Sequence, residues 1–424
     1  MDTKKLIAAL EKGGAGFALL YGPQESEKRE RCRRAAGQFE GLFGNLPGSR
    51  LLSVPGRSEV CGNHTDHNHG RVLACAVDLD IVAVAAPSGD DTVVIQSEGF
   101  EPDTVQLQEL GRRADEKGRA SALIRGVCAR LKELGYRVEG FRAYTTSNVL
   151  KGSGLSSSAA FEVMTAHIIN ALFNGGGIAP VEMAKVGQYA ESVYFGKPCG
   201  LMDQTACAVG GFVAIDFRDP AAPVLDRVDF DFAGAGHALC IVDTRGDHAD
   251  LSDDYAAIRD EMTAVAEELG HGHLRACSRE EFAARIPELR VKLGDRAVLR
   301  AIHFFGDDAR VPLEAAALRA GDFETFLRLV NESGRSSYMY LQNIYSLKTP
   351  RRQGLALALA LAEQQLQGRG AFRVHGGGFA GTIQAFVPQE LYPSFSREMN
   401  RVFGADACHR LSVRPAGAYA FDFD

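Results

Sequence analysis

The chain of 424 residues has no tryptophan, no Cys-x-x-Cys pair and no long apolar run. Its nine cysteines are scattered and odd in number, a pattern typical of buried, reduced thiols rather than of a disulfide framework or a zinc ribbon. Apolar stretches such as 81–87 are only as long as a strand, far short of the roughly 18 residues that cross a bilayer. The N-terminus shows no signal-peptide pattern. These absences predict a cytoplasmic protein that does not insert into a membrane.

An excess of positive charge is also missing. Lysine and arginine number 47 against 54 acidic residues, for a net charge of −7, which excludes a general coat for nucleic acid or for an anionic membrane. Hydrophobic residues make up 46% of the chain and charged residues 24%, values typical of a globular protein. At roughly 150 residues per domain, the length favours two large domains.

The common nucleotide fingerprints are absent as well. The sequence contains no G-x-x-x-x-G-K-[ST], no G-x-G-x-x-G placed after a strand, and no H-R-D or D-F-G pair. A phosphate site in this chain must therefore be of another kind.

Strands and helices alternate along the whole chain, which predicts a mixed fold of helix and sheet. Strands are predicted at 51–55, 71–87, 93–98, 138–146, 211–216, 238–243, 382–387 and 418–423. Helices are predicted at 4–12, 116–135, from about 159 to 173, and at 180–196, 253–269, 310–320, 323–334 and 351–368. Two prolines in 216–224 suggest the domain boundary, so we expect an N-terminal domain of residues 1–218 and a C-terminal domain of residues 219–424.

Three stretches carry unusual chemistry: PGRSEVCGNHTDHNHG at 55–70, SNVLKGSGLSSSAA at 147–160 and VHGGGFAG at 374–381. The second is a Gly/Ser loop that opens a helix. Free backbone N–H groups and the positive end of the helix dipole suit an anion, and glycine lets the backbone approach it. A Gly/Ser turn with a purely structural role would show the same sequence pattern.

Together these stretches resemble the galactokinases, members of the small-molecule kinase superfamily named for galactose, homoserine, mevalonate and phosphomevalonate. The family signature reads approximately G-R-V-N-[LI]-I-G-E-H-T-D-Y-N-x-G, and residues 56–70 are similar to it. Residues 152–160 are close to G-x-G-L-S-S-S-A-[AS], residues 198–204 to P-C-G-[IL]-M-D-Q, and residues 376–381 to G-G-G-F-G-G.

The resemblance implies an α+β, two-domain kinase fold with the active site in the cleft between the domains. It implies ATP- and Mg²⁺-dependent phosphorylation of a hexose at its anomeric hydroxyl, with galactose as the first candidate. Asp203 matches the catalytic aspartate and Arg57 the arginine beside it. The phosphate loop corresponds to Gly152, Ser153, Gly154, Leu155, Ser156, Ser157 and Ser158, and the Mg²⁺ ligands to Ser158 and Glu191. The galactose positions correspond to Asn63, His64, Asp66, Gly200 and Tyr255.

Two departures from the signature concern the sugar. Asn63 stands where the family has a glutamate that contacts the far hydroxyl of the hexose, and His67 replaces a tyrosine. The sequence therefore predicts weak galactose binding, which Asn63→Glu would tighten by up to about tenfold. The alternative is a modified galactose such as N-acetylgalactosamine.

Two further functions compete with a sugar kinase. The run H-T-D-H-N-H at 64–69, together with His271 and His273, could form the zinc site of a metallohydrolase. Some relatives of the galactokinases are non-catalytic sensors of sugar and ATP, although the Ser-Ala run at 158–160 is intact here. Nothing in the sequence indicates a protein or nucleic-acid partner.

Overall fold

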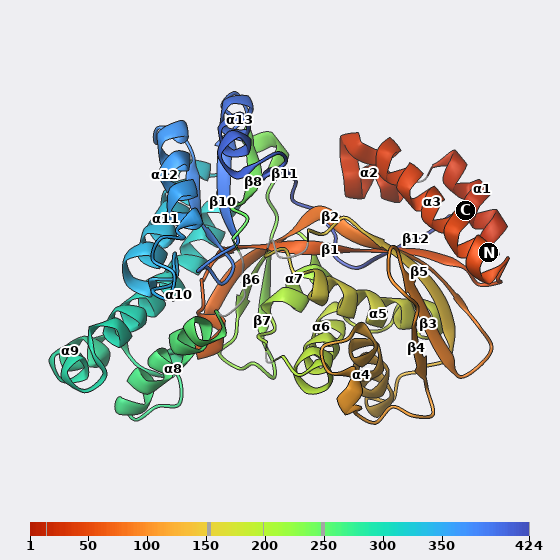
Figure 1. The fold of residues 1–424 in the computed structure, drawn as a ribbon, viewed down its shortest axis with the longest axis horizontal. Helices are drawn as coiled ribbons and strands as arrows, with labels where there is room; N and C mark the ends of the chain where they lie inside the picture. Colours follow the sequence, from red (N-terminus) through yellow and green to blue (C-terminus); the bar gives the residue numbers. More distant parts are fainter. Residues whose placement is uncertain (14, 151–153, 198, 247–250, 424) are drawn as a thin grey trace.

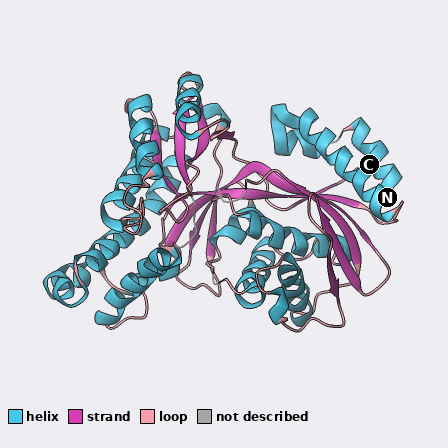
Figure 2. Cartoon of the chain, viewed as in Figure 1, coloured by secondary structure: helices cyan, strands magenta, loops and turns pink. Residues whose placement is uncertain are grey.

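The computed structural model describes residues 1–13, 15–150, 154–197, 199–246 and 251–423. They form two β-sheets that are covered by helices on both faces (Figures 1 and 2). The strands are β1 (Arg50–Cys61), β2 (Arg71–Pro87), β3 (Thr92–Ser97), β4 (Asp103–Gln106), β5 (Phe141–Ser147), β6 (Phe212–Asp216), β7 (Val224–Val228), β8 (His237–Asp243), β9 (Ala371–His375), β10 (Thr382–Pro388), β11 (Cys408–Leu411) and β12 (Tyr419–Phe421). The helices are α1 (Thr3–Lys12), α2 (Ala15–Tyr21), α3 (Glu25–Phe43), α4 (Ala120–Glu133), α5 (Ser157–Phe173), α6 (Pro180–Tyr189), α7 (Met202–Val209), α8 (Ser252–Glu268), α9 (Arg279–Leu293), α10 (Asp295–Arg319), α11 (Phe323–Ser336), α12 (Gly354–Leu366) and α13 (Tyr392–Phe403).

The first sheet has the order β12-β1-β2-β5-β3-β4, and β6 and β7 extend it from β2. Only the β3–β5 pair is parallel among the described strands. Alternation along β2 places Val82, Val84 and Ala86 against α1–α3, and Ala83 and Ala85 against the larger core with α4–α7. The period of two therefore buries both faces of this sheet.

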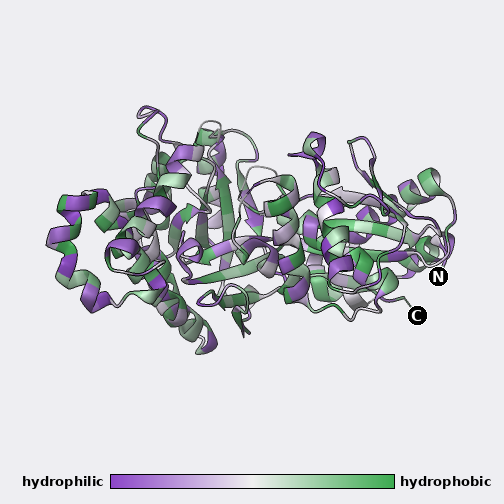
Figure 3. Cartoon of the chain, turned by 90° about the horizontal axis from the view of Figure 1, so that it is seen from below, coloured by the Kyte–Doolittle hydropathy of each residue, from purple (hydrophilic) through white to green (hydrophobic). Residues whose placement is uncertain are grey.

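The second sheet has the order β11-β8-β10-β9. Ala238, Cys240 and Val242 of β8 pack with α12 and α13, while Leu239 and Ile241 on the opposite face join the larger core. Helices α8, α9 and α10 extend from this lobe as an arm with a small core of its own, and at this end of the molecule hydrophilic and hydrophobic residues alternate along the helices (Figure 3).

The strands predicted from alternation are confirmed, but two features differ from the expectation. Strand β1 continues past Pro55-Gly56 to Cys61, because β-bulges at Pro55/Arg57 and Glu59/Cys61 absorb the irregular residues. The division predicted at 218/219 does not coincide with the division between the sheets, because β7 and β12 both belong to the first sheet.

All nine cysteines are free thiols, and only Cys199 is partly exposed. Among the described helices, none is long and apolar enough to cross a membrane.

Candidate active site

Three of the stretches singled out in the sequence lie together in the structure. They are the signature of residues 56–70, the described part of the Gly/Ser loop at 152–160 and the glycine-rich stretch at 376–381. Strand β1 passes directly under the Gly/Ser loop: the Arg57 N–H donates to the Leu155 carbonyl at 3.1 Å, and a Cβ at Gly56 would lie 2.8 Å from that oxygen. Gly154, with φ of +72°, leaves room for His375 at the end of β9, 3.0 Å from where its Cβ would lie. Gly56 is needed because the Leu155 carbonyl approaches too closely for a side chain, and Gly154 because of its positive φ and the nearby His375 ring.

Arg57 and Asp203 form an ion pair at this junction. The Arg57 Nη2 and Nε atoms lie 2.6 and 2.8 Å from Asp203 Oδ1, and the guanidinium also donates to the Gly154 carbonyl. The other Asp203 oxygen accepts a hydrogen bond from the Ser156 hydroxyl. The Arg57 side chain is 7% exposed and that of Asp203 33%, so the carboxylate is the member of the pair that solvent can reach.

The setting of Asp203 keeps it ionised. Burial alone would raise the pKa of this carboxyl, but the charge and hydrogen bonds of Arg57, followed by the Ser156 hydroxyl, outweigh burial and hold the pKa below its ordinary value. Asp203 also lies in the first turn of α7, where the helix dipole favours negative charge.

The Gly/Ser loop ends at the N-terminus of α5. Ser156 has a left-handed backbone with φ of +57°, Leu155 is buried, and Ser157 and Ser158 form the first helical positions. The Ser156 hydroxyl donates to Asp203, so the N-terminus of α5 lies beside the junction that holds this carboxylate. Gly152 and Ser153, also predicted for the phosphate loop, lie outside the described residues, as does Pro198.

Ser158 and Glu191 lie together, as the resemblance implies. The Ser158 hydroxyl is 3.3 Å from Glu191 Oε1, and Lys197 Nζ is 3.1 Å from the same oxygen. The Gln204 amide donates to Glu191 Oε2 at 3.0 Å and to the buried Glu162 at 2.9 Å. A hydroxyl and a carboxylate held in this way are oxygen donors suited to a hard cation.

His64 follows Asn63 in a left-handed conformation with φ of +59°. Burial lowers its pKa to about 3, so the ring is neutral. His64 Nε2 lies 2.9 Å from the Gly377 carbonyl, which can only accept, so Nε2 carries the proton and Nδ1 is left as an acceptor.

Asp66, Gly200 and Tyr255 lie around the same loop. The Asp66 carboxylate lies so close to Gly200 that a Cβ there would be 2.2 Å from Oδ2. The Tyr255 hydroxyl donates to the Gly378 carbonyl at 2.9 Å, and its ring stacks beside His64 with centroids 6.5 Å apart. Four of the five predicted sugar residues, His64, Asp66, Gly200 and Tyr255, thus lie in or beside the loop of residues 62–70.

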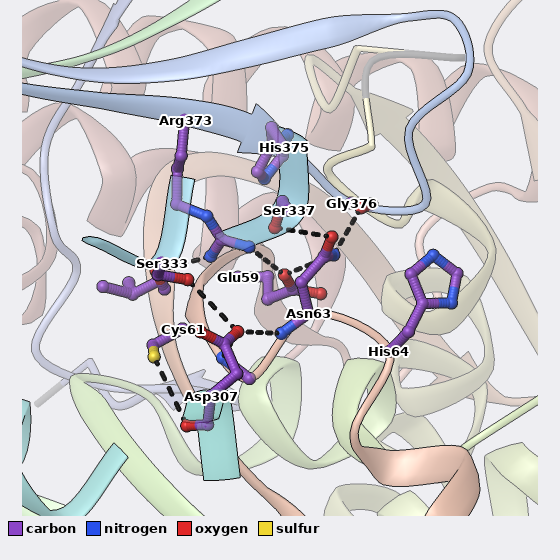
Figure 4. A network of polar contacts seen from close by, with 12 residues as sticks. Glu59, Cys61, Asn63, His64, Asp307, Ser333, Ser337, Arg373, His375 and Gly376 are labelled. Carbon is purple, nitrogen blue, oxygen red and sulfur yellow. Dashed lines mark hydrogen bonds and ion pairs between the residues drawn. The ribbon is translucent and has the colours of Figure 1, made fainter. Parts of the chain in front are cut away.

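The fifth predicted sugar residue, Asn63, is bonded to other groups of the protein. It is fully buried, and its amide donates to Glu59 Oε1 at 2.9 Å and to the Gly376 carbonyl at 2.7 Å, while its oxygen accepts from Asn343 at 2.8 Å (Figure 4). In this structure protein groups meet both the amide and the oxygen of Asn63, and its role as an acceptor for a sugar hydroxyl stays a prediction.

The histidines of the signature do not converge. His64 contacts the Gly377 carbonyl, His67 lies 3.7 Å from Asp66, and His69 stacks on His273 with ring centroids 3.9 Å apart. In the described part of the chain, no three His, Cys, Asp or Glu side chains could hold one metal ion. The geometry gives the zinc-hydrolase alternative no support.

Sequence reasoning missed several members of the site. Gln204 follows Asp203 directly, and Glu162 lies one helical turn after Ser158, so spacing could have identified both. The contact of Ser156 with Asp203, and that of Asn343 with Asn63 across 280 residues, leave no local pattern in the sequence.

Known proteins share these features. Residues 37–87 match the family described as "Galactokinase galactose-binding signature", and residues 122–211 match "GHMP kinases N terminal domain". The chain is 34% identical to human galactokinase over 412 residues, covering 95% of this chain and 99% of the relative. It is 31% identical to the galactokinase of Streptomyces coelicolor over 373 residues, covering 87% and 92%.

The fold also matches solved structures. A Lactococcus lactis galactokinase complexed with galactose superposes with a TM-score of 0.76 at 23% identity, covering 90% of this chain and 98% of that one. The mevalonate kinase of Methanococcus jannaschii gives 0.59 at 16% identity, covering 86% and 98%. These likenesses confirm the predicted two-domain α+β kinase fold. Because motifs, whole-length similarity and fold agree, this chain belongs to the galactokinase family.

Proposed function

We propose that the protein transfers the γ-phosphoryl group of ATP to the anomeric hydroxyl of galactose. The observation that carries this proposal is the position of Asp203, which is held on one side by Arg57 of the sugar signature and on the other by Ser156 of the Gly/Ser loop. The carboxylate thus stands between the predicted sugar site and the predicted phosphate site. The predicted cleft between the domains would then admit both substrates.

Asp203 is the base of the proposed reaction. It stays ionised beside Arg57 and can accept the proton of the attacking hydroxyl, while the guanidinium compensates the charge that gathers there. Phosphoryl transfer needs alignment and charge neutralisation more than covalent chemistry. The loop from Gly154 to Ser158, with the start of α5, supplies N–H groups for the phosphates, and Gly152 and Ser153 belong to the same proposed loop.

Ser158 and Glu191 would hold Mg²⁺, which when bound neutralises the phosphate charge. The role of this chain is to present the two oxygens at fixed positions, and Gln204 does so by bridging Glu191 and Glu162. Lys197 compensates the Glu191 carboxylate from the other side.

His64, Asp66, Gly200 and Tyr255 are the proposed sugar contacts. The Asp66 carboxylate can accept from two adjacent hydroxyls, and His64 Nδ1 can accept from a third. The close approach of Asp66 to Gly200 fixes the position of that carboxylate. The free thiols agree with an enzyme of the reducing cytoplasm.

A coupled assay of ADP release tests the proposal. The purified protein is given ATP and Mg²⁺ with galactose, glucose, N-acetylgalactosamine or no sugar, and the product is analysed for phosphate at C1. We expect galactose to give the highest kcat/KM, with one ADP released for each galactose 1-phosphate formed. If only N-acetylgalactosamine is phosphorylated, then this sugar and not galactose is the substrate. Galactose binding without ADP release would favour a non-catalytic sensor.

A further inference from the structure

The sugar loop, residues 62–70 between β1 and β2, is joined at its start to the lobe of the second sheet by a buried polar network (Figure 4). Asn63 lies at its centre, with Glu59 and the Gly376 carbonyl accepting from its amide and Asn343 donating to its oxygen. Asn63 thereby connects β1, the loop between β9 and β10, and the segment after α11. These contacts are more typical of a side chain that fixes backbone than of one that waits for a ligand.

Glu59 is the charged member of this network. Its Oε1 atom accepts from Asn63 at 2.9 Å and from Arg373 Nη2 at 2.9 Å, and the Arg373 side chain is completely buried. The Glu59 carboxylate therefore pairs directly with the buried Arg373, whose charge Asp307 and Glu314 also offset, and it orients the Asn63 amide. Both interactions depend on the negative charge being at position 59.

The backbone of the loop is fixed from the other side by α10. The N–H groups of Gly62 and Asn63 donate to Asp307 Oδ2 at 3.2 and 3.0 Å, and His303 Nε2 lies 2.9 Å from the Asn63 carbonyl. The next residue along the chain is His64, whose ring is bonded to Gly377. Any displacement of Asn63 would therefore move His64 and the loop that follows it.

The family signature has an amide at the position of residue 59 and a carboxylate at that of residue 63, whereas this chain has Glu59 and Asn63. We propose that the two residues are a reciprocally exchanged pair, in which Glu59 supplies the carboxylate and Asn63 is a positioning residue that holds the sugar loop against the glycine-rich loop. In either arrangement, positions 59 and 63 together hold one carboxylate and one amide. For its effect on the sugar, the inference rests on the proposed function; the pairing itself does not.

The exchange has a direct consequence for single substitutions. Asn63→Glu alone would place a second carboxylate beside Glu59 and against the Gly376 carbonyl, in a buried network that already holds Asp307 and Glu314. Glu59→Asn alone would remove the carboxylate that is in direct contact with the buried Arg373. Each single change is unfavourable for an opposite reason, so the two together should compensate.

A double-mutant cycle tests the pair. Wild type, Glu59→Asn, Asn63→Glu and the double variant are compared by thermal unfolding without ligands, and then by galactose KM and kcat. Asn45→Glu is the matched control, because Asn45 is exposed and accepts only from the Lys4 N–H among its described contacts. We expect each single variant to lower Tm by at least about 5 °C, the double variant to recover at least half of that loss, and the control to change little.

The kinetic constants for galactose should follow the same pattern as Tm, with losses in the single variants and recovery in the double variant. Asn63→Glu should raise the KM for galactose about tenfold with a smaller effect on kcat, and the double variant should reverse much of the rise. If Asn63→Glu does not fold, the isosteric set Asn63→Asp, Glu59→Gln and their combination replaces it.

Two outcomes would overturn the inference. The first is an Asn63→Glu protein that keeps its Tm and binds galactose more tightly, which would make Asn63 a sugar contact. The second is a double variant whose losses are simply additive, which would show two independent residues. A wild type that is inactive on galactose, combined with recovery of Tm in the double variant, would refute the proposed substrate and leave the pair standing.

Discussion

At the scale of single residues, the proposed reaction depends most on Asp203. Asp203→Asn keeps the shape of the side chain and can still accept from Arg57, but it removes both the base and the negative charge. We expect kcat to fall by about 100-fold or more, in line with the usual contribution of a general base, while galactose binding stays within a few-fold. Steady-state kinetics and calorimetric binding of galactose measure the two quantities. A variant with nearly unchanged kcat would show that another group takes the proton.

The pH dependence of the reaction is a separate test of Arg57. In the wild type the pKa of Asp203 lies below its ordinary value, so the base is fully ionised between pH 5 and 8 and gives no acid limb there. In Arg57→Gln the charge that opposes burial is gone, so the pKa of Asp203 should rise. We expect lower kcat/KM and an acid limb that lies at higher pH than in the wild type. A profile with an unchanged acid side would show that Arg57 does not keep Asp203 ionised.

The residue scale also shows where sequence reasoning ends. The resemblance to the galactokinases implied roles for Asp203, Arg57, Ser158 and Glu191, and in the structure their side chains lie in two pairs, Arg57 with Asp203 and Ser158 with Glu191. The sequence did not indicate the contacts of Asn63, because its partners Gly376 and Asn343 are about 300 residues away in the chain. A motif shows which residue type has changed, but it does not show whether its partner has changed as well.

At the scale of elements, the apolar alternation of β2 and β10 was sufficient to predict them. Helix α3 was missed because its sequence is highly charged and its buried residues form only a narrow stripe, which includes Cys32, Ala36 and Phe39. Strand β9 was missed because the buried Arg373 interrupts its apolar pattern. Helix α3 is rich in helix-forming residues and lacks only a broad apolar face, whereas β9 is stabilised by tertiary contacts that its local pattern does not indicate.

Asp80 of β2 joins α2, α3 and Arg414, so its substitution tests how strongly such contacts stabilise the fold. Its carboxylate contacts Arg31 of α3 at 2.6 Å, Arg414 near the C-terminus at 3.0 Å and the Tyr21 hydroxyl of α2 at 2.6 Å. Asp80→Asn would leave the buried Arg414 without a counter-charge, and we expect a loss of about 3–5 kcal/mol in the free energy of unfolding at pH 7. Urea unfolding measures the loss, and Asp422→Asn, an exposed partner of Arg50, should change little.

The same carboxylate makes stability depend on pH. Burial would raise the pKa of Asp80, but Arg31 and Arg414 lower it to about 2, against an ordinary value of 3.8. A carboxyl with a depressed pKa stabilises the fold above its unfolded pKa, and this contribution is lost as pH falls from about 4 toward 2. The stability difference between wild type and Asp80→Asn should therefore shrink over that range. A constant difference would show that the Asp80 charge is not its source.

At the scale of the whole molecule, the two lobes are connected by more than one passage of the chain. After β11 in the second sheet, the chain returns to the first sheet, where β12 pairs with β1. The Glu59–Arg373 ion pair connects the lobes a second time, at the proposed active site. The sequence predicted a strand at 418–423 but not its pairing with β1, because the residues of a strand do not show which distant strand of the chain it will pair with.

Because of these connections, we expect the protein to unfold in one cooperative transition, although chains of this size often show two. Phe421 of β12 tests this expectation, since it is buried at 3% exposure and its ring lies 4.5 Å from that of Phe17 in α2. Phe421→Ala should cost about 3–5 kcal/mol and, at roughly 2–4 °C per kcal/mol, lower the whole transition by about 10 °C. Phe100→Ala, at a ring that is 57% exposed, is the matched control. Calorimetry that resolves two transitions, only one of which moves in Phe421→Ala, would show that the lobes unfold independently despite the shared strand.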